Sequence, residues 1–540
     1  MKTNPNKLWI FVFALGWLFD FLFWQNKPGV NFAIFSTACL VAAFYLLLSD
    51  GLRPNRFSLI LLPLFGFFAA VTFIRAEPMT TFLAYTFTLL TMTILAVTYL
   101  GGRWILYTFI DYLGKSLQLF GSMIAAPITF IADVRKAQTE AGVVPSKRNI
   151  WPVVRGIVIA LPVIAIFASL LASADVVFGQ RLEDLINWFN IDNLPELIFR
   201  FVYIVVVGYA LAGVVLHAAT QSKDEKLANE DKPLIPPFLG YVEATIVLGS
   251  VVALFTAFVV IQFQYFFGGT TNIHIDGYTY AEYARRGFGE LVTVAFFALL
   301  MLLTLSAITK RESESQRQFF SGLGVALVAL LLVMLVSAFK RLGLYEEVYG
   351  FSRLRTYTHV FLIWIGLLLI VTIALEILRK ERMFTFAMLI ASFGFAMTLP
   401  ILNVDEFIVK QNIQREMIVI KSESSSSLRT GSVELDASYF LDLSDDAVPA
   451  LVEAYLTPTL SDSVREQIGA SLACINYEHG RDTREVSWQS FHFATVNADR
   501  ALASIKSDLK KFKIDDSNYY AAMVTTPSGD EFSCSPYYYD

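Results

Sequence analysis

Long apolar runs alternate with short polar segments along most of the chain, and their lengths predict membrane-spanning helices. A helix needs about 20 predominantly apolar residues to cross the hydrocarbon core of a bilayer. Eleven runs are near that length: residues 1–24, 30–49, 57–74, 79–100, 151–173, 197–219, 238–266, 287–308, 319–339, 356–378 and 383–402. The first run follows Lys2 and Lys7 but lacks a small-residue cleavage site, so we expect an uncleaved span there instead of a signal peptide.

A further apolar stretch, residues 104–131, is interrupted by polar residues at helical spacing. Its apolar positions recur on one side and its polar positions on another, as in Leu113 and Leu117 against Lys115 and Gln118. This pattern is typical of an amphipathic helix that lies along the membrane surface. If the stretch instead crosses the membrane, every later segment changes sides.

Residues 403–540 are more polar and are long enough to form a domain of their own. Ser444 followed by Asp445 and Asp446 resembles the start of a helix, and Val464, Ile468 and Leu472 recur at helical spacing. The sequence therefore predicts an all-α fold with two parts. Residues 1–402 form a polytopic transmembrane helical bundle of about eleven spans plus an interfacial helix, and residues 403–540 form a small, mostly helical, soluble C-terminal domain.

Composition supports this class of protein. The chain is 55% hydrophobic and 16% charged, whereas about a quarter of the residues in soluble proteins are charged. The charge is unevenly divided, because residues 1–402 carry 30 basic and 25 acidic side chains and residues 403–540 carry 12 and 22. An acidic tail speaks against a nucleic-acid partner, which a basic face would bind. The lipid bilayer is the partner that composition implies.

Basic residues in the loops indicate the orientation of the chain. Counting loops alternately from the N-terminus, one side of the membrane collects 19 Lys and Arg residues and the other side nine. The more basic side is cytoplasmic by the positive-inside rule. We therefore expect a cytoplasmic N-terminus and, after eleven spans, an extracytoplasmic C-terminal domain.

Two charged loops carry most of the basic residues on the less basic side. In the first, residues 276–291, Glu282, Arg286 and Glu290 are spaced four apart and would pair along one face of a helix. The second, residues 340–361, carries Tyr, Arg and His side chains at the entrance to a span. We expect the two loops to touch on the same membrane face.

Three explanations fit these basic residues. They pair with nearby glutamates, they bind an anionic ligand such as a lipid phosphate, or the two loops are cytoplasmic and the assumed order of sides is wrong. On the second explanation, the candidates for ligand or lipid contact are Arg285, Arg286, Arg353, Arg355, Tyr357 and His359.

Ionisable residues inside predicted spans are few, and a charge in hydrocarbon faces protein or water because exposure to lipid is costly. The candidates for buried charge are Glu243, Glu282, Glu290 and Arg200. Near the end of a span, the alternative is a side chain that extends to the membrane surface.

The sequence offers no motif for catalysis or for metal binding. It contains no phosphate-binding glycine loop, no H-E-x-x-H and no G-x-S-x-G, and its five histidines are scattered. We assign no catalytic residue, no metal and no cofactor. Cys39 lies in an apolar run, whereas Cys474 and Cys534 both lie in the tail and would form a disulfide if the tail is exported. The alternative is two buried free thiols.

Four separated stretches resemble a family of bacterial multi-pass membrane proteins catalogued as a domain of unknown function, of the 4153/4173 type. They are TYAEYARRGFGEL, YGFSRLRTYTHVF, NVDEFIVKQNIQR (403–415) and YFLDLSDDAVPALV (439–452), and they occur in this order. The resemblance covers roughly residues 60–510. It implies a location in the bacterial plasma membrane and a tail that belongs to the same unit, but no activity.

Two functions are compatible with these patterns. The first is a non-enzymatic sensory, scaffolding or interaction role at the cell envelope, with an anionic lipid or a protein as partner of the C-terminal domain. The second is a transporter or lipid-handling protein that uses the charged loops 276–291 and 340–361. A membrane-embedded enzyme would require His359, Tyr357 or Glu290 to converge in one pocket.

Overall fold

A computed structural model of the chain describes residues 5–140, 194–223, 227, 236–267, 288–423, 435–481, 487–517 and 522–535, with 160, 163–164, 167–168, 170–175 and 177–181. In this part of the chain, eleven helices are long and apolar enough to cross a membrane. The predicted polytopic helical bundle is thereby confirmed.

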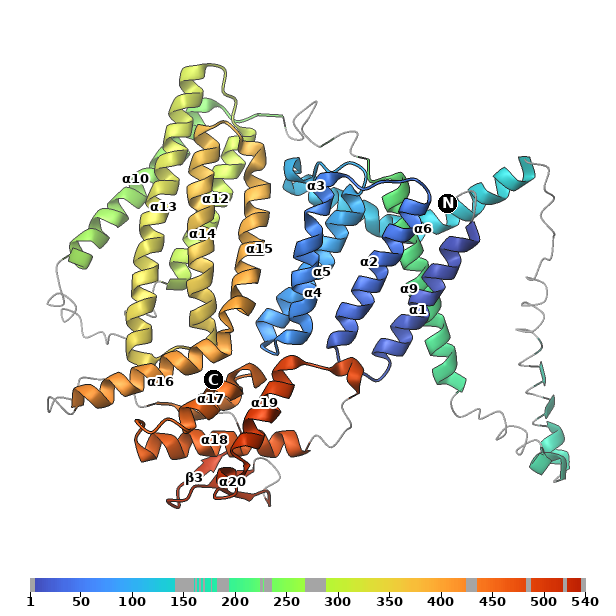
Figure 1. The fold of residues 1–540 in the computed structure, drawn as a ribbon. Helices are drawn as coiled ribbons and strands as arrows, with labels where there is room; N and C mark the ends of the chain where they lie inside the picture. The colour runs from blue at the N-terminus through green and yellow to red at the C-terminus, as the bar shows by residue number, and fades with distance from the viewer. Residues whose placement is uncertain are drawn as a thin grey trace.

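The helices form two groups that stand side by side (Figure 1). The first group contains α1 (Pro5–Phe23), α2 (Val30–Ser49), α3 (Arg56–Leu59), α4 (Leu61–Ile74), α5 (Pro78–Thr98), the short helix η1 (Trp104–Leu106), α6 (Phe109–Glu140) and α9 (Leu194–Thr220). The second contains α10 (Tyr241–Phe267), α12 (Phe288–Ile308), α13 (Glu314–Tyr349), α14 (Arg353–Ile377), η4 (Glu381–Met383) and α15 (Phe384–Leu402). Phe87 of α5 and Phe393 of α15 pack their rings together at 5.1 Å and join the two groups.

The N-terminus and the C-terminal domain lie at opposite ends of the helices (Figure 1). Near the start of α1, Leu8 packs with the ends of α2 and α5 in one cluster. The tail contacts the other ends, where Val30 at the start of α2 donates its N–H to the carbonyl of Phe491 at 3.1 Å. We call these two ends the N-terminal face and the C-terminal face.

Helix α6 includes most of the stretch predicted to be interfacial. By length and composition it is one of the eleven candidate spans. Figure 1 shows it inclined to α1 and α9 near the N-terminal face, and it packs against the chain from Tyr209 of α9 to Gln221. Leu113, Leu117 and Phe120 form an exposed apolar stripe on it. An exposed apolar stripe suits a helix at the membrane surface, but its length and composition also suit a span, so the interfacial course stays a prediction.

The chain changes faces between α6 and α9, because α9 begins at the C-terminal face and ends at the N-terminal face (Figure 1). At its N-terminal-face end, Ser122 of α6 bonds to His217 of α9 at 2.8 Å. The sequence places a span at residues 151–173 in this interval, and most of that prediction lies outside the described residues.

The C-terminal part is helical with one small sheet. It contains α16 (Val404–Glu423), η5 (Ala437–Asp442), η6 (Asp445–Ala447), α17 (Val448–Tyr455), α18 (Asp462–Arg481), η7 (Trp488–Ser490), α19 (Phe493–Ser504) and α20 (Lys506–Leu509). Three short strands, β1 (Lys513–Asp515), β2 (Met523–Thr525) and β3 (Glu531–Ser533), pair antiparallel in the order β1-β2-β3. The helical prediction for the tail is correct, but it did not include the sheet, because strands of three residues are too short to show a period of two.

The tail shares a core with the membrane helices. One cluster of buried side chains extends from Phe68 and Phe393 in the helical groups, through Ile408 of α16, to Leu451 and Leu472 in the tail. Asn403, in the left-handed conformation at φ 53°, ends α15 and redirects the chain into α16. The expected boundary at residue 403 therefore falls at a turn, but apolar packing continues across it.

Candidate functional site

Asp405, in the first turn of α16, is fully buried and accepts four hydrogen bonds. The guanidinium of Arg353 donates to its two oxygens from Nε at 2.8 Å and from Nη2 at 2.5 Å. Ser444 donates to Oδ2 from its backbone N–H and its hydroxyl, each at 2.7 Å. The N–H of Arg353 also donates to the Tyr439 hydroxyl at 2.8 Å. A bidentate, charge-assisted pair thus ties α14 and the tail to the start of α16.

Glu77 is the N-cap of α5 and is 1% exposed. Its carboxylate accepts the N–H groups of Met79 at 2.9 Å and Thr80 at 2.8 Å, two of the donors that a helix start leaves unpaired. Pro78 at the first helical position has no N–H to satisfy. Tyr357 of α14 donates its hydroxyl to Oε1 of the same carboxylate, so one buried group both starts α5 and contacts the second helical group.

Asp446, in the tail, accepts hydrogen bonds from the turn that precedes α5. The N–H groups of Ala76 and Glu77 donate to Oδ2 at 2.7 and 3.1 Å, and Arg75 lies 3.4 Å from Oδ1. Burial raises the pKa of the Asp446 carboxyl above its usual range, although the donors from Ala76 and Arg75 oppose that shift. Arg75 also donates from Nε to the carbonyl of Pro400 at 3.0 Å.

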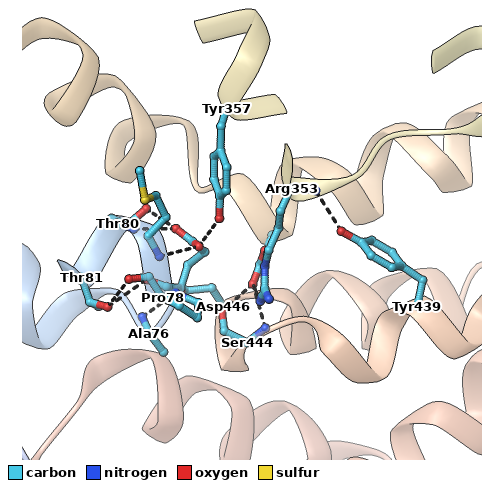
Figure 2. A network of polar contacts seen from close by, with 12 residues as sticks. Ala76, Pro78, Thr80, Thr81, Arg353, Tyr357, Tyr439, Ser444 and Asp446 are labelled. Atoms are coloured by element: carbon cyan, nitrogen blue, oxygen red, sulfur yellow. Dashed lines mark hydrogen bonds and ion pairs between the residues drawn. The ribbon is translucent and has the colours of Figure 1, made fainter. Parts of the chain in front are cut away.

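These three carboxylates form one network at the C-terminal face, where the two helical groups meet the tail. Figure 2 shows Tyr357 and Arg353 approaching from α14, Ala76 to Thr81 from the start of α5, and Tyr439, Ser444 and Asp446 from the tail. We call it the junction network. Its members are Arg75, Ala76, Glu77, Thr80, Arg353, Tyr357, Asp405, Tyr439, Ser444 and Asp446.

Protein donors surround each carboxylate of the junction network. An acid or base catalyst must reach the proton of a substrate, whereas the oxygens of Asp405 and Glu77 face helix N–H groups, a guanidinium and hydroxyls. Among the described residues, no group of three His, Cys, Asp or Glu side chains is arranged to hold a metal ion. The geometry suits a structural connection between three parts of the chain.

The second charged loop is described in the structure, and protein groups contact its candidate ligand residues. Arg355 donates from Nη1 to the carbonyls of Tyr349 and Gly350, and its guanidinium lies 4.3 Å from the ring centre of Tyr345. His359 lies 3.0 Å from the buried carboxylate of Glu346. His359 thus contacts a nearby glutamate, as in the pairing explanation, whereas Arg353 pairs with the distant Asp405 and Arg355 with backbone carbonyls.

The first charged loop lies largely outside the described residues. Arg285, Arg286 and Glu282 belong to that part, and so does the predicted contact between the two loops. Glu290 is described at the start of α12 and is exposed. Glu243, in the first turn of α10, is exposed as well. The prediction of buried charge is therefore wrong for Glu243 and Glu290, because each lies at a helix end.

Arg200 forms a separate polar cluster inside the first helical group. It donates to the buried Asp20 of α1 from Nε at 2.9 Å and from Nη2 at 2.6 Å, and Tyr203 donates to the same carboxylate. The guanidinium lies 5.1 Å from the ring centre of Trp24. A charged pair between two spans neutralises groups that hydrocarbon would otherwise destabilise.

The tail has an ion cluster of its own. His479 lies 3.1 Å from Asp445 and 2.9 Å from Asp499, and Thr495 donates to Asp445 at 2.6 Å. The hydrogen bond to Asp445 raises the pKa of His479 to about 9. Burial alone would raise the pKa of Asp445, but the hydrogen bonds from His479 and Thr495 hold it below its usual range.

Cys474 and Cys534 are bonded to each other and link α18 to the segment after β3. Cys39 is the free cysteine and is buried. The disulfide holds the small sheet against the helices of the tail.

Sequence reasoning named Arg353 and Tyr357 but missed the partners Glu77, Asp405 and Arg75. The family resemblance was a signal that could have found them. Three of the four stretches that carry the family resemblance supply junction residues: YGFSRLRTYTHVF contains Arg353 and Tyr357, NVDEFIVKQNIQR contains Asp405, and YFLDLSDDAVPALV contains Tyr439, Ser444 and Asp446.

The eleven apolar helices of the described residues, with a tail built onto their ends, define a multi-pass integral membrane protein. The chain matches the family described as domain of unknown function DUF4153 over residues 62–454, and it belongs to that family. The match spans the whole junction network and ends before the disulfide. No curated protein and no solved structure matches the chain.

Proposed function

We propose that this membrane protein has a non-enzymatic role at the cell envelope, in which the tail couples the two helical groups and transmits a signal or a partner's binding between them. The observation that carries the proposal is the junction network. Asp446 connects the tail to the first group through the turn before α5. Asp405 connects it to the second group through Arg353.

Further contacts of the tail with the first helical group support this role. Besides the network, the segment at Ser490 and Phe491 contacts the turn between α1 and α2, where the Ser490 hydroxyl donates to the carbonyl of Lys27 at 2.9 Å. Phe493 packs against Phe73 of α4 with ring centres 5.9 Å apart. A change in the shape of the tail would therefore alter contacts with both groups.

The proposal places the C-terminal face outside the cytoplasm of a bacterial cell. The basic residues of the loops favour a cytoplasmic N-terminal face. A disulfide in the tail favours an oxidising compartment at the opposite face. An extracytoplasmic tail is open to partners or conditions of the envelope, which is the arrangement that a sensory or scaffolding protein needs.

The coupling is tested by measuring the separation of the two helical groups in the intact protein. Spin labels at Val41 of α2 and Ile363 of α14, both exposed, report that distance in lipid nanodiscs after Cys39→Ala removes the free thiol. We expect one narrow distance distribution in this background. Asp405→Ala with Asp446→Ala should broaden or shift it, because both connections to the tail are removed.

The matched control is Asp445→Asn, which changes the neighbouring carboxylate. Asp445 contacts His479 and Thr495 within the tail. Its substitution should leave the distance distribution unchanged. If the double variant behaves like this control while circular dichroism shows a folded protein, the tail does not couple the groups and the proposal fails.

Lipid handling is a second candidate. Among the described members of the charged loops, Arg353 and Arg355 are engaged by protein groups, so support for this candidate comes from elsewhere. It comes from an apolar cavity in the first helical group.

A further inference from the structure

A cavity of about 310 Å³ lies inside the first helical group. Five helices line it, with Leu15 from α1, Cys39 from α2, Met92 from α5, Met123 from α6 and Leu211 from α9 on its wall. The lining is almost entirely aliphatic, aromatic and sulfur-containing. This cavity is separate from the junction network, which lies at the opposite end of the helices.

The lining determines what the cavity can hold. A buried water needs two to four polar partners, and an apolar cavity of about 150 Å³ stays dry and takes up benzene. A cavity of about 310 Å³ has room for a longer hydrocarbon. Its chemistry therefore selects an apolar occupant over water or a polar solute.

The cavity is open to the outer surface of the bundle near the N-terminal face. Phe120 of α6 and Leu89 of α5 both belong to its wall and are 60% and 54% exposed. On the outer surface of a membrane-spanning group, the neighbouring molecules are lipids. Leu113 and Leu117 extend the apolar surface along α6 away from Phe120. A lipid chain can pass from the bilayer into the cavity along this surface.

The polar groups close to the N-terminal end of the cavity suit a lipid head group with negative charge. Lys7 lies with its ammonium 4.5 Å from the ring centre of Tyr45, which is adjacent in sequence to the wall residues Phe44 and Leu46. His217 precedes the wall residue Ala218, is fully buried, and has no hydrogen-bond partner for Nε2 among the described residues. His217 donates from Nδ1 to Ser122, whose hydroxyl donates to Gln221, so Nε2 is an acceptor, and the ammonium of Lys7 is the group that supplies positive charge for an anionic head group.

We propose that this cavity binds one acyl chain of an anionic phospholipid from the leaflet at the N-terminal face, with α6 lying over the bound chain. The bound lipid fills the space between α1, α2, α5 and α9. It would remain bound when the bulk lipid is exchanged.

The test uses the full chain in nanodiscs that contain phosphatidylglycerol with a diazirine near the end of one acyl chain. After illumination, cross-linked peptides are mapped by mass spectrometry. We expect strong labelling of peptides that contain Met92 and Met123. Labelling restricted to residues on the outer surface would overturn the proposal.

Two variants reduce the space in the cavity, and one is a matched control. Ala42 is 7% exposed and lines the cavity, whereas its neighbour Val41 is 62% exposed and does not. Ala42→Phe should reduce the labelling of the cavity at least tenfold, and Val41→Phe should leave it unchanged. Ala96→Leu, a smaller change on the same wall, should also reduce labelling if Ala42→Phe fails to fold. Equal labelling in all three variants would refute an internal site.

The head group is tested by competition. Unlabelled phosphatidylglycerol should displace the probe at a concentration at least tenfold lower than phosphatidylcholine does. Equal competition by the two lipids would overturn the assignment of an anionic head group. None of these readouts depends on the contacts of the tail, so failure of this proposal and failure of the coupling role can be told apart.

Discussion

Replacement of Asp405 by Asn should weaken the attachment of the tail more than any other single change in the junction network. The carboxylate is fully buried and accepts two bonds from Arg353 and two from Ser444. The substitution keeps the size of the side chain but leaves the guanidinium without a counter-charge. Removal of one partner of a buried pair costs about 3–5 kcal/mol. The Arg353 side chain is 21% exposed, so water offsets part of the loss and we expect about 3 kcal/mol.

Hydrogen exchange in the full-length protein in nanodiscs measures this loss. The amides of α17 lie in the core that the tail shares with α16, and a loss of about 3 kcal/mol corresponds to roughly 100-fold faster exchange through opening of the tail. Peptides from α12, which packs against α13 in the second group, serve as the internal reference.

A double substitution distinguishes a charge effect from loss of shape. Arg353→Met with Asp405→Leu removes both charges and retains apolar volume, and such replacements of buried pairs are often neutral. The double variant should therefore exchange more slowly than Asp405→Asn alone. If it exchanges as fast, or if Asp405→Asn accelerates exchange less than tenfold, the pair is not what holds the tail.

Three further changes test other contacts. Glu77→Ala removes the N-cap of α5 and the acceptor of Tyr357, so hydrogen exchange at Met79 and Thr80 should become faster by an amount equivalent to about 2 kcal/mol. Glu77→Gln keeps an acceptor and should accelerate exchange less. Gly29→Ala would place Cβ 2.9 Å from the Phe491 carbonyl oxygen and should loosen the tail by about 1–2 kcal/mol, whereas Gly66→Ala meets nothing within 4 Å and should not. His479 has a raised pKa in the folded tail, so its contribution of about 2–3 kcal/mol should be complete below its unfolded value of 6.5 and lost as the pH rises through about 9. Asp445, whose folded pKa is lowered, should lose its contribution to stability as the pH falls below about 4. The melting temperature of the protein measured against pH should show both transitions, and His479→Asn should remove them.

The spans could be predicted from the sequence because hydrocarbon imposes one requirement on every helix that crosses it. Runs such as 30–49 and 383–402 match α2 and α15 within a residue or two. The course of the stretch 104–131 is harder to predict, because length and composition alone do not separate a helix that crosses the membrane from one at its surface. The alternation of Leu113 and Leu117 with Lys115 and Gln118 predicts a surface course, whereas length and composition place α6 among the candidate spans.

The junction network could not be predicted because its partners are far apart in the chain. Tyr357 and Glu77 are 280 residues apart, and Asp446 is 370 residues from Ala76. Each residue alone resembles an ordinary charge or tyrosine near a membrane surface. Only packing of the two groups against the tail brings them together. Glu243 and Glu290 are exposed for a different reason, since each lies in the first turn of its helix, whereas the apolar runs in the sequence place them inside spans.

The disulfide gives a way to determine which face of the membrane carries the tail. Closing the 60-residue separation between Cys474 and Cys534 restricts the unfolded tail, and chain entropy for a loop of that length predicts a stabilisation of about 4 kcal/mol. Such a bond persists in an oxidising compartment and is reduced in the cytoplasm. We therefore expect it to be intact in cells if the C-terminal face is extracytoplasmic.

Counting thiols in protein taken directly from cells decides this point. After acid quenching and denaturation without reductant, a polyethylene glycol maleimide should add one group per chain, at Cys39, because Cys39 is the free cysteine. Cys39→Ser should take up none, and Cys474→Ser should take up two, at Cys39 and at the released Cys534. Uptake of three groups by the unaltered chain would mean that the tail is in a reducing compartment. In that case the N-terminal face, despite its many basic residues, would be outside, and the coupling role would have to respond to cytoplasmic partners.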